Sequence, residues 1–513
     1  PQNRHDSRSN QSNKIRLTLT FLLNPCIIFC FNIYFSDHGG YVSLIDEQTL
    51  NKCLNILLSA GAEYADIFAE KGRFYSSLSD DRKISSSAHE QAGVGIRAIK
   101  DNADYYMVCE SFNPNRILET TRQLSSGLKL SGSESSVILK TGDFPEMYKP
   151  IKDPRTISLT EKVGMLKEAE QSAWHFSDKI KQVSLHYSDF NREILFASSE
   201  DQEILHKNLA LIEFFIYVYA GNRDDERQLG RAGKSFYRGW EAFEGENSPQ
   251  NLVKEACEQA VLMLEARDCP SGEMPVVFAP GGNGVLFHES CGHGMEGDLV
   301  QKGSSFAGLI DKEVCSHKIT IKDSGIIPGF PGSFAFDDEG IESQETTLIE
   351  NGFLRNYLHS RMTARQMNTS PTGSGRRQCY RYPPVPRMRN TFIEACPDDP
   401  EEIVKSTKCG LYAADVGFGG QVDVVTGRFI TSIILGYMIE DGKLTYPVKG
   451  ATITGIGIET LKDIDMVGSD LIMDPSSGRC GKGQEVPVGV GMPTLRVKKL
   501  VVGGAGQSFE GSV

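Results

Sequence analysis

The chain contains 513 residues, with 54 Lys and Arg against 67 Asp and Glu, which gives a formal net charge of −13. At roughly 150 residues per domain, this length predicts two to four domains, each able to bury a core of its own. The acidic balance argues against broad binding to a phosphate backbone, which needs clustered Lys and Arg. No direct nucleic-acid partner is therefore expected.

Cysteine and glycine usage narrows the class of protein further. The 12 cysteines are scattered without a CxxC pair or a regular framework. Such usage is typical of a reduced, cytoplasmic protein rather than of a disulfide scaffold. Of the 51 glycines, 36 lie after residue 270. Glycine therefore concentrates in the half of the chain where the chemistry-bearing motifs lie.

The first 44 residues form an extension whose status stays open. Residues 17–35 are apolar and follow Lys14 and Arg16, as in a secretory signal or a membrane anchor. However, Pro25 interrupts the run, and no small-x-small cleavage site follows it. An artefact of the gene boundary, or an extension absent from the mature protein, explains residues 1–44 equally well. No membrane contact is expected in the mature folded part.

Residues 45–270 predict an N-terminal mixed α/β domain. Helices are expected where apolar residues recur at helical spacing, over 45–60, 114–125, 158–180 and 249–267. Strands are expected at alternating apolar runs, over 64–77, 82–87, 92–99, 103–110, 181–188, 192–199, 204–220 and 229–237. Between them, we expect a loop over 124–136 and a charged turn over 222–227.

Residues 271–513 predict a second, glycine-rich domain of mostly antiparallel β structure. Asn-Gly, Thr-Gly and Asp-Gly pairs lie between apolar alternations and predict hairpins, at 351–352, 426–427 and 441–442. The segment 369–386 is a long loop with three arginines, and loops of this length are usually functional or disordered. The predicted fold class is therefore α+β, with an N-terminal mixed α/β domain followed by a glycine-rich, mostly antiparallel β domain.

The sharpest local feature is an HExxxH pattern formed by His288, Glu289 and His293. Neutral imidazoles bind Zn²⁺, and a carboxylate beside them can take a proton from metal-bound water. At ~100° per residue, positions five residues apart diverge by about 140° around an α-helix. Convergence of the two histidines therefore predicts a local distortion, such as a π-type widening. Gly292 and Gly294 would permit it, because glycine tolerates unusual backbone angles.

The pattern alone leaves the ligand set open, since two structural histidines on a helix would look the same. Cys291 lies three residues after His288, so an unmodified helix would bring these two side chains to one face. Such a pair is chemically suited to zinc. His317 and His359 are further candidates, but a lone histidine in an apolar or mixed run is more often structural.

A late cysteine, Cys480, stands in a different context. It lies between Gly478 and Gly481, beside Arg479 and Lys482. Neighbouring cations would lower the pKa of its thiol and favour the thiolate that a metal needs. The alternative is a loop cysteine without a role, and the local residues do not separate the two.

Several distant motifs in this order resemble the TldD/PmbA family, also called modulators of DNA gyrase, whose TldD branch comprises zinc metallopeptidases. The resemblance runs from about residue 45 to residue 513. It is carried by HExxxH with GMEGD at 288–298, by CGKGQ at 480–484 and by PVGVGMPTLRV at 487–497. Five earlier or central segments also match, at 64–70, 93–100, 371–377, 386–395 and 414–429.

The resemblance implies His288, His293 and Cys480 as ligands of one zinc ion and Glu289 as the general base. It argues against a ligand at Cys291. The sister PmbA/TldE branch lacks the HExxxH ligands, so their presence here is typical of the TldD branch. The implied activity is hydrolysis of small or unstructured peptides inside a closed dimer cavity. That dimer is either a homodimer or a heterodimer with a PmbA/TldE-like subunit.

The long loop supplies candidate substrate-binding residues, Arg376, Arg377, Tyr380 and Tyr382. Any of them could stabilise the oxyanion of peptide hydrolysis together with zinc. The alternative is a solvated basic loop. The glycine-rich strands could bind an extended peptide through its backbone.

Two other classes of function compete with peptide hydrolysis. A non-catalytic regulatory or binding partner of a TldD/PmbA-type complex would gain support if zinc were absent. A nucleotide enzyme is disfavoured, because the chain has no GxxxxGK[ST] motif.

Overall fold

The computed structural model describes the folded part of the chain with short interruptions, over residues 44–128, 137–142, 147–223, 226–417 and 420–508. The apolar run 17–35 lies outside these residues, as do most of the predicted loop 124–136 and part of the turn 222–227. Among the described residues, no helix combines the length and the apolar character that crossing a membrane requires.

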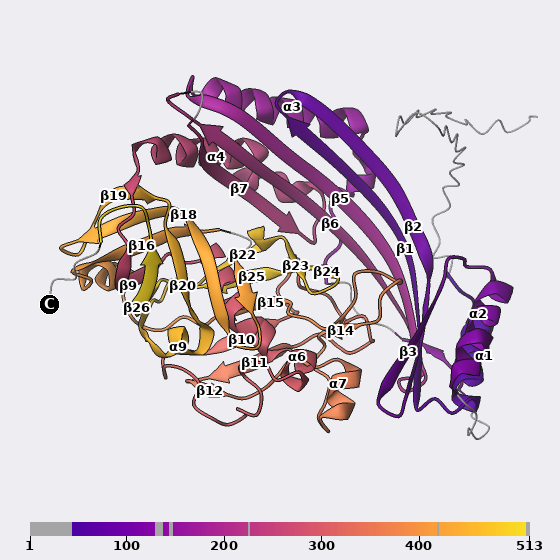
Figure 1. The fold of residues 1–513 in the computed structure, drawn as a ribbon. Coiled ribbons are helices and arrows are strands. Elements are labelled where there is room, and N and C mark those ends of the chain that lie inside the picture. Colours follow the sequence, from indigo (N-terminus) through magenta and orange to yellow (C-terminus); the bar gives the residue numbers. More distant parts are fainter. Residues whose placement is uncertain (1–43, 129–136, 143–146, 224–225, 418–419, 509–513) are drawn as a thin grey trace, which may run out of the picture. The chain divides into compact units, whose positions relative to one another are not determined.

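Seven strands form the first sheet, in the order β3-β2-β1-β5-β6-β4, with β7 paired to β6 (Figure 1). The four long strands β1, β2, β5 and β6 are antiparallel to their neighbours. The bounds are β1 Tyr64–Asp80, β2 Lys83–Lys100, β3 Ala103–Cys109, β4 Lys140–Thr141, β5 Ile180–Ser198, β6 Glu203–Ala220 and β7 Gln228–Phe236.

Strands β2 and β5 are continuous, whereas the sequence predicts two shorter strands in each of these segments. In β2, residues Lys83 to Ile99 pair with β1 without a shift in register. The mostly polar residues 88–91, which indicate a break in the sequence pattern, lie exposed or half-buried within the strand. A strand with solvent on both faces needs no apolar alternation, so the pattern disappears while the hydrogen-bond ladder continues.

Four helices accompany this sheet, namely α1 Glu47–Ser59, α2 Pro114–Gly127, α3 Leu159–Phe176 and α4 Pro249–Leu262. All four were predicted, with α3 and α4 ending a few residues early. The start of α3 is fixed by a capping box, in which Ser158 and Glu161 each accept a hydrogen bond from the other's backbone N–H. Figure 1 shows α3 and α4 along one face of the long strands, and α1 and α2 beside β3.

The second half of the described chain contains two larger sheets. One has six strands in the order β12-β11-β10-β15-β25-β22, and the other runs β16-β9-β26-β20-β18-β19-β8, with β17 on β18 and β21 on β26. The six-stranded sheet comprises β10 Ile321–Ser324, β11 Glu345–Glu350, β12 Phe353–Leu354, β15 Asn390–Ile393, β22 Ile472–Asp474 and β25 Gly489–Met492.

The nine-stranded sheet comprises β8 Arg267–Asp268, β9 Gly272–Phe278, β16 Cys409–Val416, β17 Gln421–Asp423, β18 Arg428–Glu440, β19 Lys443–Lys449, β20 Thr452–Ile456, β21 Ile464–Val467 and β26 Leu495–Gly503. Pairing is mostly antiparallel, with parallel exceptions such as β16 with β9. The fold is therefore α+β, as predicted.

Tight turns join β11 to β12 and β18 to β19, where the sequence predicts hairpins. Asn351 and Gly352 have φ of 47° and 87°, and Asp441 and Gly442 have 51° and 73°. Positive φ at both central residues matches the right-handed twist of the flanking strands, which explains the Asn-Gly and Asp-Gly pairs. The hairpin predicted at Thr426-Gly427 is also present, between β17 and β18.

A short helical segment is buried in the hydrophobic core of this half. Its side chains Leu286, Phe287, Cys291 and Met295 pack with strand residues such as Phe278 in one apolar cluster. The short helices are α5 Val285–Phe287, α6 Gly297–Gln301, α7 Arg361–Gln366, α8 Pro400–Lys405 and α9 Gly457–Lys462.

The long segment 369–386 is packed into the protein rather than solvated. It contributes two short paired strands, β13 Gly375–Arg376 and β14 Val385–Pro386. Arg376 and Arg377 are 3% and 1% exposed. The interpretation as a solvated basic loop is therefore wrong for these two arginines, which donate to three backbone carbonyls and to the Tyr106 hydroxyl inside the protein.

A buried ion network joins the first sheet to the second half of the chain. Arg97 on β2 is fully buried and forms ion pairs with Asp66, Asp104 and Glu339. Its Nε lies 2.6 Å from Asp104 Oδ1. Since Asp66 and Glu339 are also fully buried, Arg97 compensates two carboxylates that have lost contact with water.

Replacement of Arg97 by Met is expected to lower the free energy of unfolding by about 3–5 kcal/mol, because it leaves the buried carboxylate of Glu339 without an ion-pair partner in the described structure and removes one of the two cations beside Asp66. Denaturant titration measures this change. Lys499→Met is the matched control, since its ion pair with Glu273 lies at the surface and should contribute less than about 1 kcal/mol. Equal effects of the two substitutions would contradict the assignment.

Candidate metal centre

The helical segment that carries the HExxxH pattern changes its winding at the pattern itself. After α5, residues His288–Gly292 form a π-helical turn, and His293–Met295 continue as a 3₁₀ turn. A π turn closes i→i+5 hydrogen bonds, so residues five apart come to one side of the helix. The predicted π-type widening between His288 and His293 is therefore confirmed.

Glycine permits this turn for a different reason from the one predicted. Gly292 has ordinary helical angles, with φ of −56° and ψ of −50°. A Cβ at Gly292 would instead lie 2.1 Å from Met388 Sδ, and one at Gly294 would lie 2.8 Å from a ring carbon of Phe306. Both glycines thus allow close packing of neighbouring side chains against the turn.

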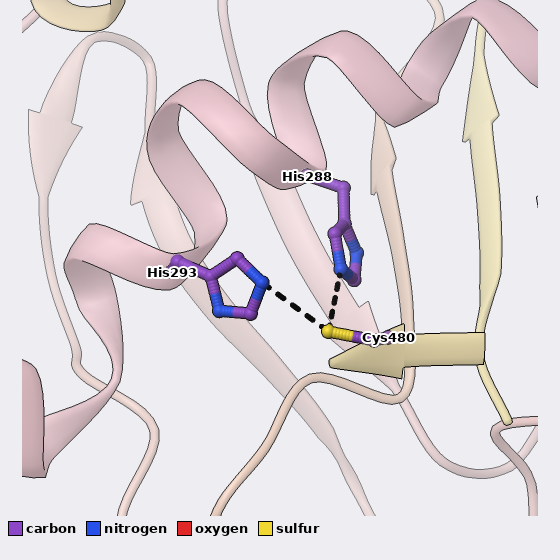
Figure 2. Close-up of side chains that lie close together, drawn as sticks. All are labelled: His288, His293 and Cys480. Atoms are coloured by element: carbon purple, nitrogen blue, oxygen red, sulfur yellow. Dashed lines mark hydrogen bonds between the residues drawn. The ribbon is translucent and has the colours of Figure 1, made fainter. Parts of the chain in front are cut away.

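The turn brings His288 and His293 together with Cys480, as Figure 2 shows. Each histidine Nε2 lies 3.2 Å from Cys480 Sγ. The three side chains offer ligand atoms that all lie within 4.8 Å of one another, and all three residues are buried. Cys480 is 187 positions from His293 and 192 positions from His288 in the chain, yet the three side chains form one compact donor set.

Cys480 reaches the histidines from a small hairpin, β23 Arg479–Gly481 with β24 Glu485–Pro487. The buried guanidinium of Arg387 donates to the carbonyl oxygens of Cys480, at 2.6 Å, and Gln484, at 2.7 Å. The turns before and after the cysteine need glycine, since Gly478 and Gly483 have φ of 74° and 69°.

The electrostatics of the cluster favour a thiolate at Cys480. Burial opposes ionisation, but the adjacent imidazoles of His293 and His288 hold the pKa of the Cys480 thiol well below its usual value. From the sequence, Arg479 and Lys482 are expected to lower the pKa of this thiol. In the structure, the two histidines lower it instead. Arg479 pairs with Glu213 at 3.0 Å, and Lys482 turns towards two carboxylates on the histidine-bearing segment.

A second carboxylate, Glu296, supports the cluster and was missed in the sequence. It is fully buried, and its Oε2 accepts from His293 Nδ1 at 2.8 Å and from Lys482 Nζ at 3.0 Å. Burial alone would raise the pKa of Glu296, but Lys482 and His293 hold it far below the usual range. The hydrogen bond at Nδ1 leaves His293 Nε2 free as a ligand atom. In the sequence, the only indication of this contact is that Glu296 follows His293 by three residues, a spacing that places two side chains on one face of a helix.

Glu289 lies at the edge of the donor set with its side chain 33% exposed. Its Oε2 is 3.7 Å from His293 Nε2. The residue borders a small cavity with Leu286, Val416 and Phe429. A partly exposed carboxylate beside buried donors can exchange protons with a molecule that enters from this side.

The other candidate ligands lie elsewhere. Cys291 is part of the hydrophobic core, and burial raises the pKa of its thiol to about 12. His317 contacts Phe353 near the surface, with the two rings tilted by 40°. His359 is buried, its Nδ1 lies 3.2 Å from Thr363 Oγ1, and desolvation lowers its pKa to about 4.

The four candidate substrate-binding residues form no hydrogen bond or ion pair with the donor set in the described part of the chain. Arg376 donates to the carbonyls of Met388 and Pro487. Arg377 contacts Asp338 and Tyr106. Tyr380 donates to Glu110, and Tyr382 packs at the edge of an apolar cluster.

The donor set fits a zinc ion by its chemistry. Two imidazoles and one thiolate are borderline-soft ligands of the kind that zinc prefers, and three protein ligands leave a coordination position for a reactant. The carboxylate that holds His293 is the usual outer partner of a metal-bound histidine.

Comparison with known proteins places the chain in a family. Residues 152–264 match the PmbA/TldA metallopeptidase central domain, and residues 271–504 match the PmbA/TldA metallopeptidase C-terminal domain. The chain is 34% identical to a metalloprotease TldD homolog of Buchnera aphidicola, over 90% of this chain and 96% of that protein. It is also 34% identical to the metalloprotease TldD homolog of Haemophilus influenzae, over 90% and 97%.

Solved structures share the fold. A Thermotoga maritima protein described as a modulator of a DNA gyrase superposes with a TM-score of 0.72 at 22% identity, covering 89% of this chain and all of that one. TldE from Thermococcus kodakarensis gives 0.68 at 17% identity, covering 86% and 97%. Fold and sequence together define a metallopeptidase. The chain belongs to the PmbA/TldD metallopeptidase family.

Replacement of Glu296 by Gln is expected to weaken zinc binding roughly 10–100-fold, the usual effect of losing an outer carboxylate on a ligating histidine. Competition with a chelator of known affinity measures this change. Asp298→Asn is the matched control, because Asp298 contacts Lys482 in the same cluster but is not bonded to His293 in the described structure. Equal losses in the two variants would show that Glu296 acts only through the shared lysine.

Proposed function

We propose that this protein is a zinc-dependent peptidase that hydrolyses small or unstructured peptides. The observation that carries the proposal is the buried cluster of His288, His293 and Cys480, with the carboxylate of Glu289 at its open edge. In this assignment the first three residues hold one zinc ion per chain. When bound, zinc would polarise a substrate carbonyl and lower the pKa of a water molecule.

The protein's own proton carrier is the carboxylate of Glu289. As general base, it accepts a proton from the attacking water at one of its Oε atoms and later passes this proton to the leaving amine. Partial exposure supports the assignment, because the carboxylate must meet both water and the peptide. His293 stays oriented during these transfers, since Glu296 holds its Nδ1 from behind.

Burial of the donor set supports the substrate class. His288, His293 and Cys480 are 2%, 5% and 4% exposed. A folded protein surface cannot reach such atoms, whereas an extended chain can enter a narrow opening. We therefore assign short or unstructured peptides as substrates. A dimer, either of two such chains or with a PmbA/TldE-like subunit, would enclose the opening further.

Free cysteines support a reducing, cytoplasmic location. Ten cysteines fall within the described residues, and none of these ten is paired in a disulfide. Persistent free thiols are typical of compartments in which glutathione and thioredoxin keep cysteine reduced.

Purified protein is expected to contain about one zinc per chain, and Cys480→Ala should lose most of it because a three-ligand site falls to two. Elemental analysis by mass spectrometry measures the content. Cys291→Ala is the control, since this thiol lies in the hydrophobic core and should leave zinc in place. If Cys291→Ala loses zinc and Cys480→Ala keeps it, the ligand assignment is wrong.

Glu289→Gln should abolish hydrolysis of an unstructured peptide while zinc stays bound, because the amide cannot take up the proton but leaves the ligands intact. Digestion of a peptide mixture, read by mass spectrometry, measures the activity, and metal content is measured on the same sample. Hydrolysis at the original rate in this variant would exclude Glu289 as the base. The digest of the unmodified protein would also reveal its cleavage preference.

A further inference from the structure

A cavity of about 160 Å³ lies behind the hairpin that carries Cys480. One wall is the face of the long sheet that includes Arg192 and Lys207, and the opposite wall contains Arg376, Arg377 and Arg479. We call it the arginine cavity. At ~30 Å³ per water molecule, it has room for roughly five waters or for a small polar group.

The lining of the arginine cavity is unusually rich in cations. Five basic side chains line it, but only two carboxylates do, Asp338 and Glu485. Asp338 is already engaged, because its Oδ1 accepts from Lys207 at 2.9 Å and its Oδ2 accepts from the backbone N–H of Arg377 at 2.9 Å. Three further cations of the lining pair with carboxylates outside it, Arg192 with Glu70, Arg377 with Asp66 and Arg479 with Glu213. Four of the five cations are therefore balanced in the described structure, and Arg376 is the one that remains.

Arg376 has no carboxylate partner among the described residues. It is 3% exposed, and its two terminal nitrogens donate to the backbone carbonyls of Met388 and Pro487, each at 2.7 Å. Burial without a counter-ion lowers the pKa of this guanidinium. A buried cation without an anion is costly, so an anion in the cavity would stabilise it.

Two further arginines of the lining leave buried donors unused. Arg192 Nη2 and Arg377 Nε have no hydrogen-bond partner in the described structure. Arg192 uses its Nε on Glu70, at 2.8 Å, and is 6% exposed. Native proteins rarely leave buried donors unpaired, and an acceptor that enters the cavity is one way of satisfying them.

The arginine cavity lies next to the candidate metal centre through one strand. Arg479 and Cys480 are successive residues of β23, so their side chains lie on opposite faces of it. Among the described strands, β23 pairs with β24 alone, which leaves its other edge open. A Cβ at Gly481 would meet no atom within 4 Å, so there is free space on the face of β23 that also carries the Arg479 side chain. An extended peptide that passes the edge can therefore reach both sites.

We propose that the arginine cavity binds a carboxylate of the peptide substrate, with Arg192, Arg376 and Arg377 as its donors. This inference rests on the proposed peptidase function, which supplies the peptide. Guanidinium groups pair with carboxylates through charge-assisted hydrogen bonds, which are stronger and more directional than neutral ones. The protein would thus select peptides that carry a free carboxylate at a fixed distance from the bond that is cut.

The first experiment compares matched peptides on the zinc-loaded protein. Each extended sequence is made with a free terminal carboxylate and with a terminal amide, over a series of lengths. At the favoured length, kcat/KM should be at least about tenfold higher for the acid. Arg376→Gln and Arg192→Gln should each reduce this ratio towards one, whereas Arg355→Gln, which lies outside the cavity lining, should keep it. Equal kcat/KM for acid and amide at every length overturns the proposal, even though the protein is then a peptidase.

The second experiment needs no activity and keeps the proposal testable if a variant fails to fold or if no peptide is cut. Calorimetry on the zinc-free protein compares N-acetylglycine with N-acetylglycinamide and with inorganic phosphate. Binding of N-acetylglycine but not of its amide supports the carboxylate site. Failure of both to bind, or equal binding of both, overturns it. Tighter binding of phosphate assigns the cavity to a free anion and contradicts the peptide assignment. Failure of hydrolysis with intact carboxylate binding would refute the peptidase function alone.

Discussion

The carboxylate of Glu296 is the interaction on which the geometry of the candidate metal centre depends. It bonds on one side to His293, on the segment that carries both histidines, and on the other side to Lys482, on the hairpin that carries Cys480. The nearby guanidinium of Arg387 holds the Cys480 carbonyl. One buried anion thus connects two elements far apart in the sequence. Removal of its charge would leave two cations and a histidine without a common partner.

Two local elements bring His288, His293 and Cys480 together around this buried carboxylate. The π turn aligns the histidines, and the glycines at its end let Met388 and Phe306 pack closely against it. The hairpin then closes over the histidines with its cysteine. Proton transfer falls to Glu289, which is more exposed than the donors beside it. Buried donors with an exposed base are the arrangement that hydrolysis of an entering peptide requires.

Local physics accounts for what the sequence could predict. The five-residue spacing of the histidines is incompatible with an ordinary α-helix, so the π turn follows from the assumption that they converge. Asn-Gly and Asp-Gly pairs predicted hairpins because these residues accept positive φ. The pairing of Cys480 with the histidines came from the family resemblance, since no local feature separated it from a loop cysteine. The roles of His288, His293 and Cys480 as zinc ligands and of Glu289 as general base stay predictions.

Long-range packing accounts for what the sequence could not predict. The polar middle of β2 continues a strand because its partner β1 pairs with every residue. Arg376 and Arg377 looked like solvated loop residues and are buried, because distant backbone carbonyls and Asp338 accept from them. Glu296 has a helical spacing from His293, but only the fold brings Lys482 to its other side.

X-ray absorption at the zinc edge, on protein loaded with one zinc per chain, tests the central claim most directly. With His288, His293 and Cys480 as ligands, the account predicts one sulfur at about 2.3 Å and two imidazole nitrogens at about 2.0–2.1 Å, with a lighter atom in the remaining position. Loss of the sulfur scatterer in Cys480→Ala should follow. A zinc shell without sulfur, or with two sulfur atoms, would contradict the assignment.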